Sequence, residues 1–240
     1  MHSLEIEERK KHIRISDFER DIIVGKLLGD GHLETKNQGR TYRLKVEHSI
    51  KQKEYVDWVY GKLRHLAMSE PCVKEKDVFP PQGGTFKFHG YGFTSLSLGQ
   101  LRFYGQQFYN HGKKVIPKMI GKMLSPSVIA IWYLDDGSLK SNTHRTYIIH
   151  TYGYTKSDLR RVQDALLKRF DIHTNLHRQN KNGKVYWRMY VMSESAWTFQ
   201  KLIEPIIKHI PSMQYKLGNT HAQKVTEGLK GWLRTNGNRP

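Results

Sequence analysis

The sequence predicts an α+β fold built from two copies of one αββαββα unit, related by a pseudo-twofold axis. Two apolar runs, residues 23–31 and 129–137, both end in Asp-Gly, and each predicts a buried helix that ends at a carboxylate. After each run come an Arg-Thr-Tyr segment, a charged helical segment, an alternating aromatic segment and an Ile-Pro pair. A repeat of about 100 residues is too long for a solenoid, so two half-domains are expected, with the two apolar helices packed together.

Helix-start signals precede both apolar runs. Ser16 and Glu19 fit a capping box ahead of the first run, and Ser125 followed by Pro126 predicts the start of the second helix. A carboxylate at the end of such a helix faces the negative end of the helix dipole, which is unfavourable without a nearby positive charge. Two helices of this kind therefore predict a cation, such as a metal, near both ends.

Alternating segments in both halves predict strands with one polar face. Residues 41–47, 85–89 and 185–191 alternate polar and apolar side chains, as half-buried strands do. The apolar side chains are expected to pack on the helices, which leaves the polar ones on an open face. That face is predicted to include Arg43, Lys45, Lys87 and His89 in the first half and Tyr186, Arg188 and Tyr190 in the second.

The repeat also sets the expected domain organisation. It predicts an N-terminal extension at residues 1–15, half-domains at 16–118 and 119–219, and a C-terminal tail at 220–240. Residues 80–84, with two prolines and two glycines, predict a loop between strands. Residues 222–233 predict a short helix in the tail.

The composition indicates a polyanionic partner. Lys and Arg number 40 against 22 Asp and Glu, giving a formal net charge of +18. Nucleic acid is the commonest polyanion, and a basic ribosomal or membrane-surface protein is the alternative. A single cysteine, Cys72, excludes an intramolecular disulfide and a cysteine-rich zinc site and favours a reducing compartment. The sequence predicts neither secretion nor membrane spanning, so a bacterial cytoplasm or the interior of a mitochondrion or chloroplast would fit.

With its two helices ending in Asp-Gly at domain spacing, the chain resembles a single-chain LAGLIDADG homing endonuclease over roughly residues 16–219. The resemblance implies two saddle-shaped antiparallel sheets lying in the DNA major groove. It also implies cleavage across the minor groove that leaves 3′ overhangs and serves the mobility of an intron or intein. No splicing signature flanks the repeat, so an intron-encoded enzyme is expected. Gly25 and Gly29 correspond to Ile131 and Asp135, which predicts less regular packing between the two helices.

Two carboxylates at neighbouring helix ends suit metal-dependent hydrolysis of a phosphodiester. Divalent cations held by carboxylates activate water and stabilise the leaving oxygen. Oxygen ligands favour Mg²⁺, with Mn²⁺ or Ca²⁺ as substitutes for binding. Alignment on the following glycine pairs Asp30 with Asp136, and these two are the predicted metal ligands. The neighbouring Asp135 is expected to point elsewhere, so that its replacement by Asn has a milder effect.

The resemblance implies further site residues. The backbone carbonyls of Gly29 and Asp135 would also reach the metals, and one basic residue would lie near each carboxylate. Lys114 and Lys216 match those positions, while Lys113 and Lys118 are rivals for the first role. The predicted DNA-binding set combines the open-face side chains named above with residues of the repeated Arg-Thr-Tyr segments, namely Arg40, Arg145 and Tyr147.

The sequence therefore predicts a monomeric, Mg²⁺-dependent endonuclease that cuts both strands of a long, asymmetric duplex target. The nearest alternative is an RNA maturase that binds intron RNA and assists the splicing of a group I intron. A non-catalytic DNA-binding regulator on the same fold is the second alternative. A maturase needs neither Asp30 nor Asp136, so the presence of both favours cleavage and leaves a dual role open. A duplex nicking assay with added metal separates the regulator from the nuclease.

Overall fold

The computed structural model describes residues 3–79, 83–140, 146–181 and 183–218. Part of the loop predicted at 80–84, the predicted DNA-binding residue Arg145 and the predicted helix at 222–233 lie outside the described residues. Among the described residues, no helix has the length and apolar character needed to cross a membrane.

The chain has the predicted α+β fold, and each half follows the order αββαββα. The first half contains α2 (Asp17–Leu28), β1 (His32–Glu34), β2 (Arg43–Ser49), α3 (Lys53–Leu63), β3 (Cys72–Val78), β4 (Phe86–Thr94) and α4 (Arg102–Phe108). The second half contains α6 (Pro126–Asp136), β7 (Gly137–Leu139), β8 (Tyr147–His150), α7 (Lys156–Phe170), β9 (Thr174–Lys181), β10 (Lys184–Val191) and α8 (Ala196–Ile207).

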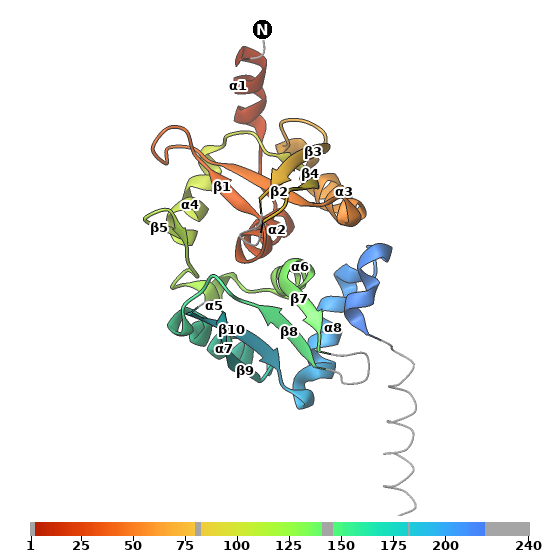
Figure 1. Cartoon of the computed structure of the whole chain (residues 1–240). Coiled ribbons are helices and arrows are strands. Elements are labelled where there is room, and N and C mark those ends of the chain that lie inside the picture. The colour runs from red at the N-terminus through yellow and green to blue at the C-terminus, as the bar shows by residue number, and fades with distance from the viewer. Residues whose placement is uncertain (1–2, 80–82, 141–145, 182, 219–240) are drawn as a thin grey trace, which may run out of the picture.

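Each half forms one four-stranded antiparallel sheet, and the two sheets share one topology. Their strand orders are β1-β2-β4-β3 and β7-β8-β10-β9. A short strand pair, β5 (Tyr109–Asn110) and β6 (Lys113–Lys114), and the one-turn helix α5 (Ile120–Met123) connect the halves. Figure 1 shows α2 and α6 side by side between the two halves, where each lies over its own sheet.

The two central helices begin at the predicted residues. At α2 the capping box is complete, because Ser16 N–H donates to Glu19 Oε2 at 2.7 Å and Glu19 N–H donates to Ser16 Oγ. At α6 the Ser125 hydroxyl accepts the N–H of Val128 at 3.1 Å, with Pro126 in the first turn. Residues 128–134 of α6 are each fully buried, as expected of a helix that is apolar on all sides.

Glycines on α2 face larger side chains on α6. A Cβ atom added at Gly25 would lie 2.7 Å from Ile131 Cβ, and one added at Gly29 would lie 2.4 Å from Asp135 Oδ2. Both distances are shorter than any van der Waals contact, so only glycine fits at these two positions. Ile131 and Asp135 of α6 fill the space that Gly25 and Gly29 leave on α2, so the two helices make close contact through unlike residues.

The N-terminal segment forms a helix, α1 (Ser3–His12), that the sequence reasoning did not predict. Its Arg9 donates to the carbonyls of His65 and Ala67 at 2.8 and 3.1 Å, just beyond α3. Those carbonyls end a helical segment and lack partners within it, so Arg9 satisfies them and fixes α1 to the first half.

Candidate active site at the ends of the two central helices

Three carboxylates meet where α2 and α6 end. Asp30 follows α2, while Asp135 and Asp136 are the last two residues of α6. The backbone N–H of Asp30 donates to Asp135 Oδ2 at 2.8 Å, so the two helix ends are in direct contact. The Asp30 side chain is half exposed, and the Asp136 carboxylate accepts a hydrogen bond from Trp132 Nε1 at 3.2 Å.

Asp135 points into the helix interface, contrary to the expectation that it points elsewhere. Its side chain is fully buried, and Oδ1 lies 2.7 Å from Lys26 Nζ. The Tyr55 hydroxyl donates to the same oxygen at 2.8 Å. The physical reason is Gly29, whose missing side chain leaves the space that the Asp135 carboxylate occupies.

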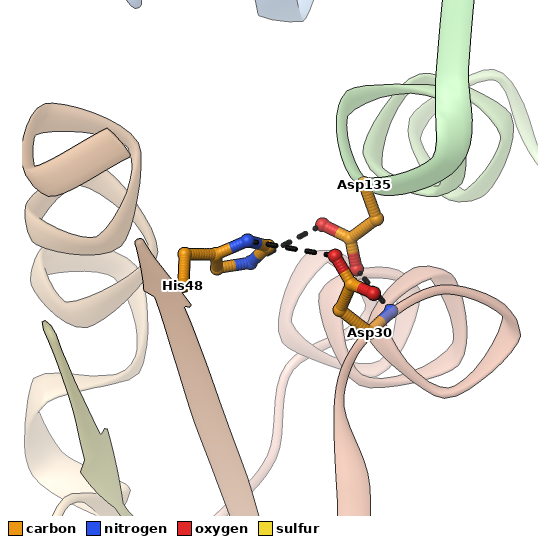
Figure 2. Close-up of side chains that lie close together, drawn as sticks. All are labelled: Asp30, His48 and Asp135. Atoms are coloured by element: carbon orange, nitrogen blue, oxygen red, sulfur yellow. Dashed lines mark hydrogen bonds and ion pairs between the residues drawn. The ribbon is translucent and has the colours of Figure 1, made fainter. Parts of the chain in front are cut away.

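His48 completes this buried cluster. Figure 2 shows His48 of β2 pointing toward Asp30 and Asp135. Burial and the neighbouring Lys26 charge lower the pKa of His48 to about 4, so its imidazole is neutral near pH 7. A neutral Nε2 can accept from the Lys26 ammonium at 2.6 Å, while Nδ1–H faces Gln52 Oε1 at 3.1 Å.

Lys26, His48 and Tyr55 were missed by the sequence reasoning. A usable signal was present at Lys26, because a charged residue in the middle of an apolar helix is almost never buried without a partner. The partner itself lies in the other half of the chain and could not be found from local sequence.

The structure places Lys114 and Lys216 at equivalent positions on the two helix ends. Lys114 Nζ donates to the carbonyls of Gly29 and Gly31 at 2.5 and 2.7 Å. Lys216 Nζ donates to the carbonyl of Leu134 at 2.5 Å and lies 3.5 Å from that of Asp135. Burial lowers the pKa of both lysines, that of Lys216 to about 8. Lys113 and Lys118, the rivals for the first role, are exposed.

The carboxylates repel one another. Burial, followed by the charges of Asp135 and Asp30, raises the pKa of Asp136 to about 8. Burial and the Asp135 charge also raise the pKa of Asp30. In both cases nearby lysines oppose the shift, yet they leave the carboxylates short of positive charge. A further cation would therefore be bound favourably here.

One group of side chains among the described residues has metal-ligand spacing. Ligand atoms of Asp30, His48 and Asp135 lie within 4.8 Å of one another. The Lys26 ammonium already lies within hydrogen-bond distance of both His48 and Asp135, so that part of the group holds a cation of its own. The carboxylates that remain available to a metal are those of Asp30 and Asp136.

The open face of the first sheet differs from the prediction. The pairing of Lys45 with Thr94 and of Glu47 with Gly92 places Phe88 and Phe86 on the same face as Lys45. Lys87 and His89 therefore point to the opposite face, where they approach Glu75 at 3.5 and 3.3 Å. Their assignment to the open face is wrong, because Phe86 and Phe88 were taken as core side chains.

The third strand of this sheet carries basic residues that the prediction missed. Lys74 and Lys76 of β3 pair with Gly90 and Phe88, so they join Lys45 on the open face. The alternation of lysines with Glu75 and Asp77 along β3 would have been a usable sequence signal. Arg40 is exposed in the loop before β2.

In the second sheet, Arg188 pairs with His150, and Tyr186 and Tyr190 lie on the same face, as predicted from the alternation. Tyr147 lies on the other face. It is 1% exposed and donates to the carbonyl of Leu217 at 3.1 Å. Tyr147 is therefore a core residue, and its predicted contact with DNA is wrong.

The fold and the site define a class of protein with two pseudo-equivalent halves, whose carboxylates meet between two open antiparallel sheets. The family model of the LAGLIDADG DNA endonuclease family matches residues 20–199, and the chain belongs to this family.

Individual relatives agree with this assignment. The chain is 28% identical over 227 residues to DNA endonuclease I-ChuI of Chlamydomonas applanata, covering 91% of this chain and 99% of that protein. It is 26% identical over 199 residues to the cytochrome b mRNA maturase bI2 of Debaryomyces hansenii, covering 83% and 73%. The fold matches that of the homing endonuclease I-WcaI, solved bound to its DNA recognition sequence, with a TM-score of 0.78 and 20% identity over 91% of this chain and 94% of that one.

Proposed function

We propose that this chain is a site-specific homing endonuclease that binds one long, asymmetric DNA duplex as a monomer and hydrolyses both strands with Mg²⁺. The observation that carries the proposal is the placement of Asp30 and Asp136 at the neighbouring ends of α2 and α6, where the charge of Asp30 acts on Asp136. Membership of a DNA endonuclease family and similarity to I-ChuI along nearly its whole length support it.

The donor set fits a hard divalent cation. Asp30 and Asp136 supply carboxylate oxygens whose pKa values are raised by burial and by neighbouring carboxylate charge, and a bound cation would offset both effects. The carbonyls of Gly29 and Asp135 each have a second lone pair besides the one that faces a lysine, so they are available as further ligands. Bound there, the metal would activate the attacking water and stabilise the leaving oxygen.

The two lysines are proposed to act on either side of the cut. Lys114 and Lys216 carry positive charge at the two helix ends, near the carboxylates. The scissile phosphates of the two DNA strands would approach these same ends. A lysine with a lowered pKa can orient a water molecule or donate a proton near neutral pH. The buried Asp135 is proposed to hold the Asp30 backbone in place through its 2.8 Å hydrogen bond, in addition to offering its own carbonyl.

The sheets are proposed to bind the major groove. A two-stranded antiparallel ribbon fits that groove, where all four base pairs can be distinguished. Lys45, Lys74 and Lys76 in the first half and Tyr186, Arg188 and Tyr190 in the second provide open-face side chains for phosphates and bases. Because the two sets differ, the expected target is asymmetric.

The direct test is to incubate the protein with a randomised duplex library and Mg²⁺ and to sequence the cut ends. The proposal predicts one asymmetric consensus and 3′ overhangs, both lost in Asp30→Asn. Selective binding without any cut ends would instead support a non-catalytic DNA-binding regulator.

A second candidate function is assistance of intron splicing, because two relatives are named mRNA maturases. It is tested by adding the protein to a precursor RNA that contains a group I intron. Faster splicing that persists in Asp30→Asn would support it. Three expectations remain predictions: an intron-encoded origin, the half-domain limits 16–118 and 119–219, and a location in a bacterial cytoplasm or an organelle.

A further inference from the structure

Arg188 is held in a fixed orientation on the open face of the second sheet. Its Nε donates to the Tyr152 hydroxyl at 2.5 Å, and its guanidinium carbon lies 5.2 Å from the centre of the Tyr152 ring. Tyr152 follows β8 and is 41% exposed. Within the described residues, the two terminal nitrogens of Arg188 make no hydrogen bond or ion pair, so this pair of donors is available to a ligand.

Neighbouring rings support Tyr152. His150 stacks on it with ring centres 5.7 Å apart, and Tyr186 meets it edge-on at 5.7 Å. His150 Nε2 lies 3.0 Å from Ser138 Oγ, and Ser138 is two residues beyond Asp136. This chain of contacts connects Arg188 to the end of α6 and places the arginine close to the proposed cleavage site.

Arg43, the arginine that the sequence suggests as its counterpart, is arranged differently. Its Nε and one terminal nitrogen lie 2.9 and 2.7 Å from Glu34 Oε2. The carboxylate neutralises the charge of Arg43 and occupies one edge of its guanidinium group. Arg43 is therefore less suited than Arg188 to bind a base.

The register also shows that the true counterpart of Arg188 has no side chain. His32 and Ser138 each lie two residues beyond their aspartate and pair with Lys45 and Ile148. Two residues further along β2, Glu47 pairs with Gly92 of β4. Two residues further along β8, His150 pairs with Arg188 of β10, so Gly92 occupies the position in the first half that Arg188 occupies in the second. A Cβ atom added at Gly92 would lie 2.2 Å from the Val46 carbonyl oxygen, so no larger residue fits there.

We propose that Arg188 binds the edge of a guanine in the half-site next to the α6 end, and that Tyr152 is its positioning residue. The two terminal N–H groups of an arginine match guanine O6 and N7 in the major groove. Holding the side chain before DNA arrives reduces the rotamer entropy lost on binding. The inference rests on the proposed function and adds one base preference, present in one half-site and absent from the other because of Gly92.

The test begins with the target obtained from the randomised library. Binding is measured at fixed salt, with Ca²⁺ in place of Mg²⁺, to this target and to every single-base-pair substitution of it. The proteins are the wild type, Arg188→Lys and Tyr152→Phe, with Tyr60→Phe on α3, outside both sheets, as the matched control. Tyr152→Phe keeps the ring contacts with His150 and Tyr186 but removes the hydroxyl that accepts from Arg188.

The wild type is expected to prefer guanine about tenfold or more at one position of the half-site beside the α6 end. Arg188→Lys and Tyr152→Phe should lose most of that preference while retaining discrimination elsewhere, and Tyr60→Phe should retain it. A guanine preference that survives in Tyr152→Phe, or equal weakening on all sequences, would overturn the inference. If the wild type cleaves its target but shows no guanine preference, the inference about Arg188 is wrong and the proposed function stands. If the wild type cuts nothing in the library, the proposed function is wrong as well.

Discussion

The two helix ends carry the same groups but hold them differently. At both ends an aspartate precedes a glycine, and a lysine donates to the last carbonyls of the helix. Asp30 is half exposed, and its backbone is held by Asp135 of the other half. Asp136 is held by Trp132 of its own helix. Gly29 has no side chain, so the first half offers no equivalent of the contact that Asp135 makes.

This difference shows which features of a duplicated site have to stay equivalent. The carboxylates and lysines that would act on each DNA strand occupy matching positions. The contacts that support these carboxylates and lysines are complementary, because the first half supplies the buried Lys26 and the second half supplies the buried Asp135. The sheets differ similarly, since lysines dominate the open face of the first and tyrosines with Arg188 that of the second.

The comparison depends most on the two aspartates. Asp30→Asn and Asp136→Asn are each expected to reduce double-strand cleavage below detection while DNA binding is retained, because each removes a proposed metal ligand that does not contact bases. Plasmid cleavage and gel-shift assays measure the two effects, with the exposed Asp164→Asn as control. Full cleavage by either variant would remove the assignment of the site.

Asp135 tests the contact that only one half makes. Asp135→Ala would leave Lys26 buried without its carboxylate and is expected to lower the free energy of unfolding by about 3–5 kcal/mol. The double variant Lys26→Met with Asp135→Asn should recover part of this loss, because it leaves no unpaired charge. Urea unfolding measures both. A loss below about 1 kcal/mol for Asp135→Ala would show that the pair is not a close contact in solution.

The two lysines test whether the ends are functionally equivalent. Lys114→Met and Lys216→Met are each expected to slow single-turnover cleavage by about 10²-fold with little change in DNA affinity, because a positioned proton donor is lost. Lys113→Met, at the exposed neighbour of Lys114, is the matched control. A control as slow as Lys114→Met would show that general charge, and not position, matters.

A salt titration compares the two sheets. Lys74→Ala is expected to weaken binding on all sequences and to reduce the slope of log K against log salt by about 0.9, as for one lost phosphate contact. Arg188→Ala should cost ~1–3 kcal/mol at one base pair with little change in slope. The same response from both variants would contradict a division of labour between the sheets.

A further expected effect is a pH dependence of stability in the metal-free protein. The pKa of Asp136 is raised from 3.8 to about 8, so between these pH values the folded state keeps a proton that the unfolded state releases. Stability should therefore fall as pH rises through this window, by up to about 1.4 kcal/mol per pH unit. Asp136→Asn should have a flatter profile, measured by urea unfolding from pH 5 to 8. Identical profiles would contradict the raised pKa.

The sequence was sufficient for the parts of the fold that local chemistry determines. Capping residues located the starts of α2 and α6, and Asp-Gly located their ends. Alternation identified strands but did not show which face packs on the helices. Along β4 the aromatic side chains suggested the core, whereas pairing with β2 puts them on the open face. Tyr147 was misassigned because it belongs to the repeated Arg-Thr-Tyr segment, whereas the structure buries its side chain in the core.

The remaining part of the site depends on how the helices cross. Lys26 and Asp135 are 109 residues apart and meet only because Gly29 lets α2 and α6 approach closely. No local pattern in either segment specifies that meeting. The two carboxylates could be found from the repeat, whereas the residues that hold them could be found only from the packing.

Glycines of α2 face large side chains of α6, so the two halves of the chain are complementary and not interchangeable. If the halves were produced as separate polypeptides, two first halves would pair Gly25 with Gly25 and bury two Lys26 side chains without Asp135. Two second halves would instead press Ile131 against Ile131 and Asp135 against Asp135. Only the mixed pair recreates the native seam, so co-expressed halves should assemble as a heterodimer and neither should form a stable homodimer.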